Sequence, residues 1–70
     1  MNNLKKMRED VGLTQHELAQ KINVTKASVS NYETGFRKPN LKVAQEIAIA
    51  ISDSGLSCSV DDLFPYKQAG

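Results

Sequence analysis

The sequence predicts an all-α domain built from five short helices. Apolar residues recur at intervals of three and four along five segments, as on one face of an α-helix, and capping or turn residues separate these segments. No stretch of useful length alternates apolar and polar residues as a strand does. With 70 residues and one cysteine, the chain must fold around one small apolar core without an intrachain disulfide.

The first helix is expected over residues 3–10. Leu4, Met7 and Val11 recur at helical spacing and should face the core. Gly12 follows, and glycine readily adopts the left-handed conformation that ends a helix. The remaining side chains of this segment are mostly charged, so the other face of the helix is expected to lie in water.

The second helix is expected to start at Gln15 and to stop at Asn23. Thr14 and Glu17 have the spacing of a capping box, in which each side chain bonds the backbone N–H of the other residue. Asparagine tolerates a positive φ better than most residues, which suits the end of a helix. The residues expected on the inner face are Leu18, Ala19 and Ile22.

The third helix is expected over residues 26–33, with Thr25 as its cap and Gly35 as its terminator. Val29 and Tyr32 are spaced to point back into the core. Only about three residues join the second and third helices, so the two must be neighbours at a steep angle.

The fourth helix is expected over residues 41–51, after a turn-forming segment that ends in the N-cap candidate Asn40. Val43, Ile49 and Ala50 lie partly outside its apolar stripe. The expected core stripe consists of Leu41, Ala44, Ile47, Ala48 and Ile51.

A short fifth helix is expected after the capping pair Ser59 and Asp62, and Pro65 should stop it. The apolar residues of this helix are Val60, Leu63 and Phe64.

Residues 15–33 closely resemble the helix-turn-helix of the lambda-repressor-like (XRE) family, the Cro and repressor type of transcriptional regulator, and the resemblance extends over residues 4–64. It implies a compact five-helix DNA-binding domain over residues 1–66, with the helix-turn-helix at 15–34. Residues 67–70 are expected to form a short C-terminal tail. The implied function is sequence-specific binding to double-stranded DNA.

The outward side chains of the third helix are the candidates for reading bases. They are short and polar, with a cation at the N-terminus, a profile that suits insertion into a groove better than a purely solvated face. Lysine can donate to guanine, asparagine can pair with adenine, and alanine can touch a thymine methyl. We assign base reading to Lys26, Ala27 and Asn31, positions that the resemblance also supports, with Ser28 and Ser30 in second rank.

The phosphate-contacting candidates lie around that helix. The start of the second helix offers unpaired N–H groups and partial positive charge, and the turn after the third helix offers cations. Such contacts fix the register and carry salt-sensitive affinity but little sequence information. The candidates are Gln15, Thr25, Arg37, Lys38 and Asn40.

The resemblance also implies a structural ion pair between Arg8 and Glu33. Glu33 follows the core residue Tyr32, and an acid in that position is unfavourable unless a cation accompanies it.

The charge distribution fits a polyanionic partner on one side only. Residues 1–42 carry eight Lys or Arg and four Asp or Glu, a balance of +4, whereas residues 43–70 carry one and four, a balance of −3. One half of the chain is therefore expected to face nucleic acid, which would repel the other half.

No signature of an enzyme or of a cofactor site is found. His16 lacks a second ligand at metal spacing, so a solvated side chain is expected, and Cys58 is expected to be a small packed group. Ser28 and Ser30 lack the context of a nucleophile. We therefore expect no catalysis, no metal, no cofactor and no small-molecule ligand.

The chain is expected to be cytoplasmic. No segment approaches the roughly 18 consecutive apolar residues of a membrane span. The first residues also lack the apolar core of a signal peptide, so no membrane contact is expected.

The expected partner is a double-stranded operator bound by a homodimer. A single small module buries little DNA surface, and specificity generally requires two half-sites about one helical turn apart. The expected dimer uses the fourth helix, the 52–58 loop and the C-terminal segment, and represses transcription from a palindromic operator. An alternative remains open: an antitoxin-like or adaptor-like module whose third helix docks a protein, with DNA binding secondary.

Overall fold

The computed structural model describes residues 2–65, which form five α-helices and, within that range, no strand. The predicted all-α class is therefore confirmed. The expected tail at 67–70 lies outside the described residues. The helices are α1 (Leu4–Asp10), α2 (Gln15–Ile22), α3 (Lys26–Thr34), α4 (Leu41–Asp53) and α5 (Val60–Leu63).

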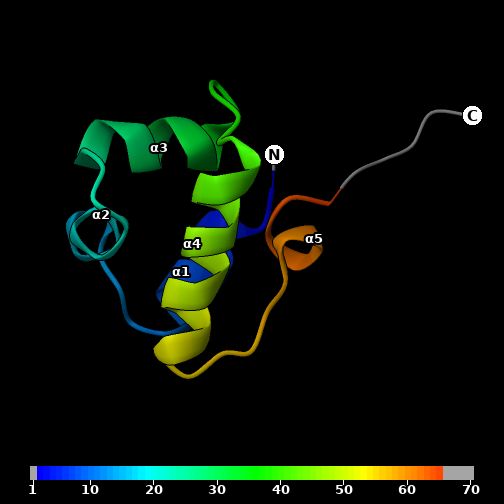
Figure 1. The fold of residues 1–70 in the computed structure, drawn as a ribbon. Coiled ribbons are helices and arrows are strands. Elements are labelled where there is room, and N and C mark those ends of the chain that lie inside the picture. The colour runs from blue at the N-terminus through cyan, green and yellow to red at the C-terminus, as the bar shows by residue number, and fades with distance from the viewer. Residues whose placement is uncertain (1, 66–70) are drawn as a thin grey trace, which may run out of the picture.

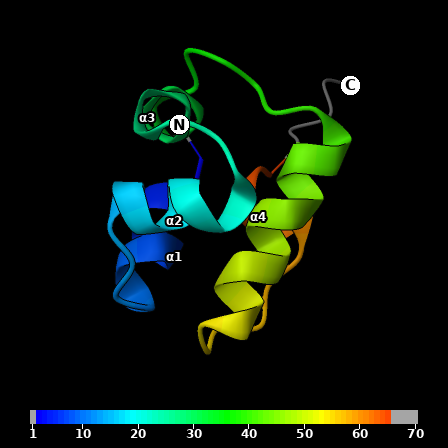
Figure 2. The ribbon, with the colours of Figure 1, turned by 60° about the vertical axis from the view of Figure 1, so that its left-hand side comes forward.

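The helix α4 packs between α2 and α5, and α3 lies at one end of the molecule. Figure 1 shows α3 lying across that end, α4 running away from it, and α5 to one side of α4. The helix α2 packs against both α3 and α4, α5 packs against α4, and α1 packs against α3. The end of α4 and the loop that follows it lie farthest from α3 in both Figure 1 and Figure 2.

The predicted caps set most of the helix boundaries. Thr14 Oγ1 accepts a hydrogen bond from the Glu17 N–H at 3.0 Å, and Glu17 Oε1 accepts one from the Thr14 N–H at 2.9 Å. The bond from the Thr14 backbone N–H, and after it the interaction with the Thr14 side chain, hold the pKa of the Glu17 carboxyl below its ordinary value, because they favour its charged form. Asn23 ends α2 with a φ of 59°, and Gly35 ends α3 with a φ of 81°. Local sequence signals therefore place both ends of α2 and the end of α3.

The helix α4 is longer than predicted, because it extends to Asp53 rather than Ile51. Ser54 forms its C-cap: the Ser54 N–H donates to the Ile51 carbonyl oxygen at 3.1 Å, and its hydroxyl donates to the Ala50 carbonyl oxygen at 2.9 Å. Ser54 thus continues the hydrogen bonding of the helix instead of interrupting it. The composition of this segment did not indicate that the helix would extend so far.

All five helices contribute to one core. The largest fully buried side chains are Leu4, Leu18, Val29, Ile47, Ile51 and Leu63. Two predictions for α4 were wrong: Leu41, expected in the core, is 67% exposed, whereas Ala50, expected near the edge, is buried. The prediction of a single apolar stripe assumes that α4 has the same neighbouring helices along its whole length. In fact α2 and α5 cover the middle of α4 from two sides, and its first turn extends beyond them.

Candidate nucleic-acid interface

The helices α2 and α3 cross at a steep angle, as the short link between them predicts. In Figure 1 α2 is seen end-on beside a sideways α3, and in Figure 2 the two exchange these views. Ala19 is 2% exposed, and its carbonyl oxygen accepts a hydrogen bond from the Val24 N–H at 3.0 Å. The small side chain allows close approach, and the bond fixes the turn, so the orientation of α3 relative to α2 is well determined.

The helix α3 has one buried side and one exposed side. Val29 and Glu33 are buried, whereas Lys26 and Ala27 are exposed. Three further candidates for reading bases are half-buried: Ser28, Ser30 and Asn31. The exposed side faces outward at the end of the molecule, where no other helix covers it (Figure 1).

Thr25 and Ser28 interact with each other at the N-terminus of α3. Thr25 Oγ1 accepts from the Ser28 N–H at 3.1 Å and lies 2.9 Å from the Ser28 hydroxyl oxygen. Both hydroxyls therefore have a partner within the chain. Ser28 is consequently a weaker candidate for reading bases than Ser30.

A buried ionic network ties α3 to α1 and α2. Arg8 Nε donates to Glu33 Oε2 at 2.5 Å, so the expected ion pair is present, and the two side chains are 8% and 4% exposed. Arg8 also donates to the Leu13 carbonyl oxygen at 2.6 Å. The second Glu33 oxygen accepts from Gln15 Nε2 at 2.8 Å, a contact that the sequence did not indicate. Glu33, in the last turn of α3, thus holds the side chain of Gln15, which is a candidate for phosphate contact.

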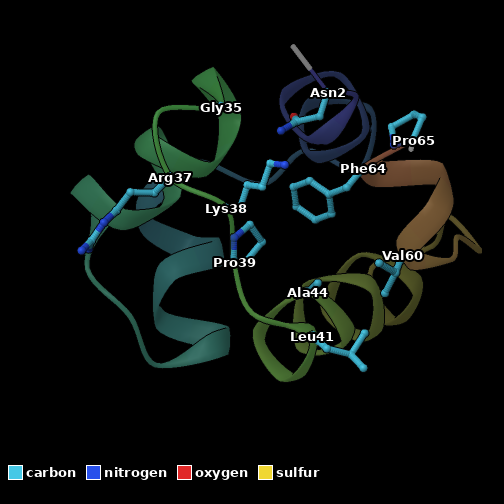
Figure 3. Close-up of a pocket in the computed structure, with 10 residues that line it drawn as sticks. All are labelled: Asn2, Gly35, Arg37, Lys38, Pro39, Leu41, Ala44, Val60, Phe64 and Pro65. Atoms are coloured by element: carbon cyan, nitrogen blue, oxygen red, sulfur yellow. The ribbon is translucent and has the colours of Figure 1, made fainter. Parts of the chain in front are cut away.

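The two cations after α3 point in different directions. Figure 3 shows Arg37 extending away from the groove beside it, whereas the Lys38 side chain runs toward Asn2 and Phe64, which line the same groove. The structure therefore does not bring the side chains of these two phosphate candidates together. Asn40 Oδ1 accepts from the Val43 N–H at 2.9 Å and caps α4, so this candidate also has a structural role.

The two ends of the molecule differ in the charged side chains that they expose. Lys26, Arg37 and Lys38 are exposed on α3 and on the loop that follows it, which together form one end in both Figure 1 and Figure 2. The exposed Asp53 ends α4 at the opposite end, and α5 carries two more exposed acids. Of these two ends, the α3 end is therefore the one that favours a polyanion.

Other kinds of site find little support in residues 2–65. This part of the chain has no group of three His, Cys, Asp or Glu placed to hold a metal, and no helix in it is long and apolar enough to cross a bilayer. His16 is exposed. Cys58 is half-buried against the core, with its sulfur 3.7 Å from the Ala48 carbonyl oxygen.

This fold and this surface define a helix-turn-helix domain: two helices joined by a fixed tight turn, the second of them exposed along one side at a basic end. A family model described as helix-turn-helix matches residues 4–52. The chain belongs to this family, and the resemblance to XRE-type regulators is confirmed.

Two relatives show the extent of the similarity. The chain is 31% identical over 67 residues to an uncharacterized HTH-type transcriptional regulator of Methanothermobacter thermautotrophicus. The aligned region covers 96% of this chain and 91% of the relative. The chain is also 39% identical over 46 residues to the uncharacterized HTH-type transcriptional regulator YqaE of Bacillus subtilis. Here the aligned region covers 66% of this chain but only 40% of the relative.

Proposed function

We propose that this protein is a cytoplasmic, sequence-specific transcriptional regulator that inserts α3 into the major groove of duplex DNA. The observation that carries the proposal is the exposed polar side of α3 at the basic end of the molecule. A B-DNA major groove about 12 Å wide admits one helix. The names of both relatives, HTH-type transcriptional regulators, support the same class of function.

Base reading is assigned to the exposed side of α3. Lys26 suits the guanine O6 and N7 acceptors, Ala27 suits a thymine methyl, and Asn31 can bond adenine through N6 and N7. Ser30 lies on the same helix, half-buried, and is a further candidate. Ser28 ranks last because its hydroxyl lies against that of Thr25.

Phosphate contact is assigned to the residues that surround α3. Gln15 stands at the first position of α2, where backbone N–H groups and the helix dipole favour an anion. Arg37 projects from the loop and is the stronger of its two cations, because the Lys38 side chain must first leave its place near Phe64. Thr25 and Asn40 are weaker candidates, since each caps a helix.

Substitutions on α3 and on the loop are expected to weaken DNA binding in different ways. Asn31→Ala should cost about 1 to 3 kcal/mol on the preferred operator and little on random duplex, because a base contact carries the sequence information. Arg37→Ala should weaken binding to all sequences alike and reduce the slope of log K against log salt by about 1. Fluorescence anisotropy over a salt series, with an operator selected from a random pool, measures both effects.

The matched control is Lys42→Ala, which removes an exposed cation from α4 and should change binding less than Arg37→Ala. If Asn31→Ala and Arg37→Ala both leave affinity and salt dependence unchanged, the groove-facing side has been misassigned. If the unaltered protein does not bind random duplex at low salt, the chain is better explained as a protein-docking module of the antitoxin or adaptor kind.

The proposed regulator is a homodimeric repressor of a palindromic operator. Of the three expected parts of the interface, the 52–58 loop lies at the end opposite α3 (Figure 2), and pairing through that loop alone would direct the two α3 helices away from each other. The exposed side of α4 is better placed for pairing of two copies, and Ile49 on that side is 59% exposed. Sedimentation of the complex should give two copies on a duplex with two half-sites, and Ile49→Asp should reduce this to one. A single copy bound by the unaltered protein at saturation would contradict the dimer.

A further inference from the structure

Phe36 is the most exposed large apolar side chain of residues 2–65, at 81% exposure, and the sequence pattern indicates no role for it. It lies in the loop between α3 and α4, directly after Gly35 and next to Arg37. Its ring contributes little to the core of this chain. Single exposed apolar residues are common, so exposure alone does not indicate a function.

A second observation distinguishes Phe36 from an ordinary loop residue: the backbone on both sides of it is bonded to the last turn of α3. The Phe36 N–H donates to Thr34 Oγ1 at 3.3 Å, and that hydroxyl donates to the Asn31 carbonyl oxygen at 3.2 Å. The Arg37 N–H donates to the same carbonyl oxygen at 3.2 Å. The backbone that carries the ring is thereby fixed relative to Asn31, a proposed base-reading residue.

The position of the loop selects the partner. In Figures 1 and 2 the loop and α3 form the same end of the molecule, so a duplex that receives α3 also passes the loop. Next to Phe36, Arg37 offers a cation that matches a phosphate. Between successive phosphates the DNA backbone presents the apolar face of a deoxyribose, and an aromatic ring beside a cation complements that alternation.

We propose that Phe36 is a DNA-contacting residue whose ring packs against a deoxyribose at the edge of the groove that α3 enters, beside the phosphate bound by Arg37. The inference rests on the proposed function and adds an apolar, sequence-independent contact to it. Burial of a ring releases no counterion. The contact therefore contributes affinity that salt does not screen, unlike the contact of Arg37.

The chain contains no tryptophan, so a single substitution places a unique tryptophan at this site, whose emission can be excited apart from that of the two tyrosines. In the Phe36→Trp variant, the tryptophan emission should change when a short duplex with one half-site is added at low salt. The matched control, Ile49→Trp, places the probe at another exposed apolar position on α4, beside Lys21, Glu46 and Asp53, and should not respond. One half-site is used so that dimer formation cannot move the control probe.

Affinity provides the second readout. Phe36→Ala should weaken binding to all duplexes by roughly tenfold, with the salt slope unchanged, and Phe36→Leu should recover part of the loss. An unresponsive Phe36→Trp in a protein that binds DNA overturns the inference and leaves the proposed function intact. A lower salt slope in Phe36→Ala also overturns it, because the loss would then come from a displaced Arg37. Absence of DNA binding by the unaltered protein is instead a failure of the proposed function.

Discussion

Arg8→Met should destabilise the protein by about 3 to 5 kcal/mol, because it leaves the buried Glu33 carboxylate without its cation. Arg8 supplies one hydrogen bond to Glu33 and another to the Leu13 carbonyl oxygen, and Gln15 alone cannot compensate for the charge. A single core of this size rarely provides more than about 3 to 5 kcal/mol, so the substituted chain should be largely unfolded at 25 °C. Urea denaturation followed by circular dichroism measures the loss.

Two further substitutions separate the buried charge from other effects. Lys6→Ala breaks an ion pair on the same helix whose partners are 77% and 49% exposed, and it should cost no more than about 0.5 kcal/mol. Adding Glu33→Leu to Arg8→Met removes the stranded acid and should recover much of the lost stability, because a buried ion pair can often be replaced by apolar residues. If Arg8→Met is as stable as Lys6→Ala, the network has no structural role.

Leu63→Ala should cost about 2 to 5 kcal/mol, because it opens a cavity in the shared core. Leu63 is fully buried although α5 has only four residues and lies beyond the segment matched by the family model. Its carbonyl oxygen also accepts the Asn3 N–H at 2.9 Å, which ties the two ends of the described chain together. The substitution therefore tests whether α5 belongs to the folded unit.

The control is the same substitution at Leu41, which is 67% exposed at the start of α4. Leu41→Ala should change the free energy of unfolding by less than about 0.5 kcal/mol. Thermal unfolding of both variants compares them directly. Equal effects at the two leucines would mean that the core is not distributed as described.

The sequence predicted the features that depend on neighbouring residues. The caps at Thr14 and Thr25 and the left-handed ends at Asn23 and Gly35 each rest on chemistry within one helical turn, and all four are present. With the helix ends fixed, the helical period places Val29 inside and Ala27 on the opposite, exposed side. That division is the geometric basis of the proposed interface.

The features that the sequence did not reveal depend on residues that meet only in the folded chain. Gln15 bonds Glu33 across 18 residues, and no local pattern indicates that contact. The exposure of Leu41 follows from which helices cover α4. Arg37 and Lys38 are adjacent in sequence, yet their side chains diverge because a groove toward Phe64 accommodates only the second (Figure 3).

Titration of the ¹⁵N-labelled protein with a short duplex, followed by amide chemical shifts at low salt, measures directly which surface receives DNA. The largest changes should fall between Thr25 and Arg37 and at the start of α2, while the end of α4 and α5 should change little. Shifts concentrated on α4 and α5, or none at all, would show that this protein does not use α3 to bind DNA.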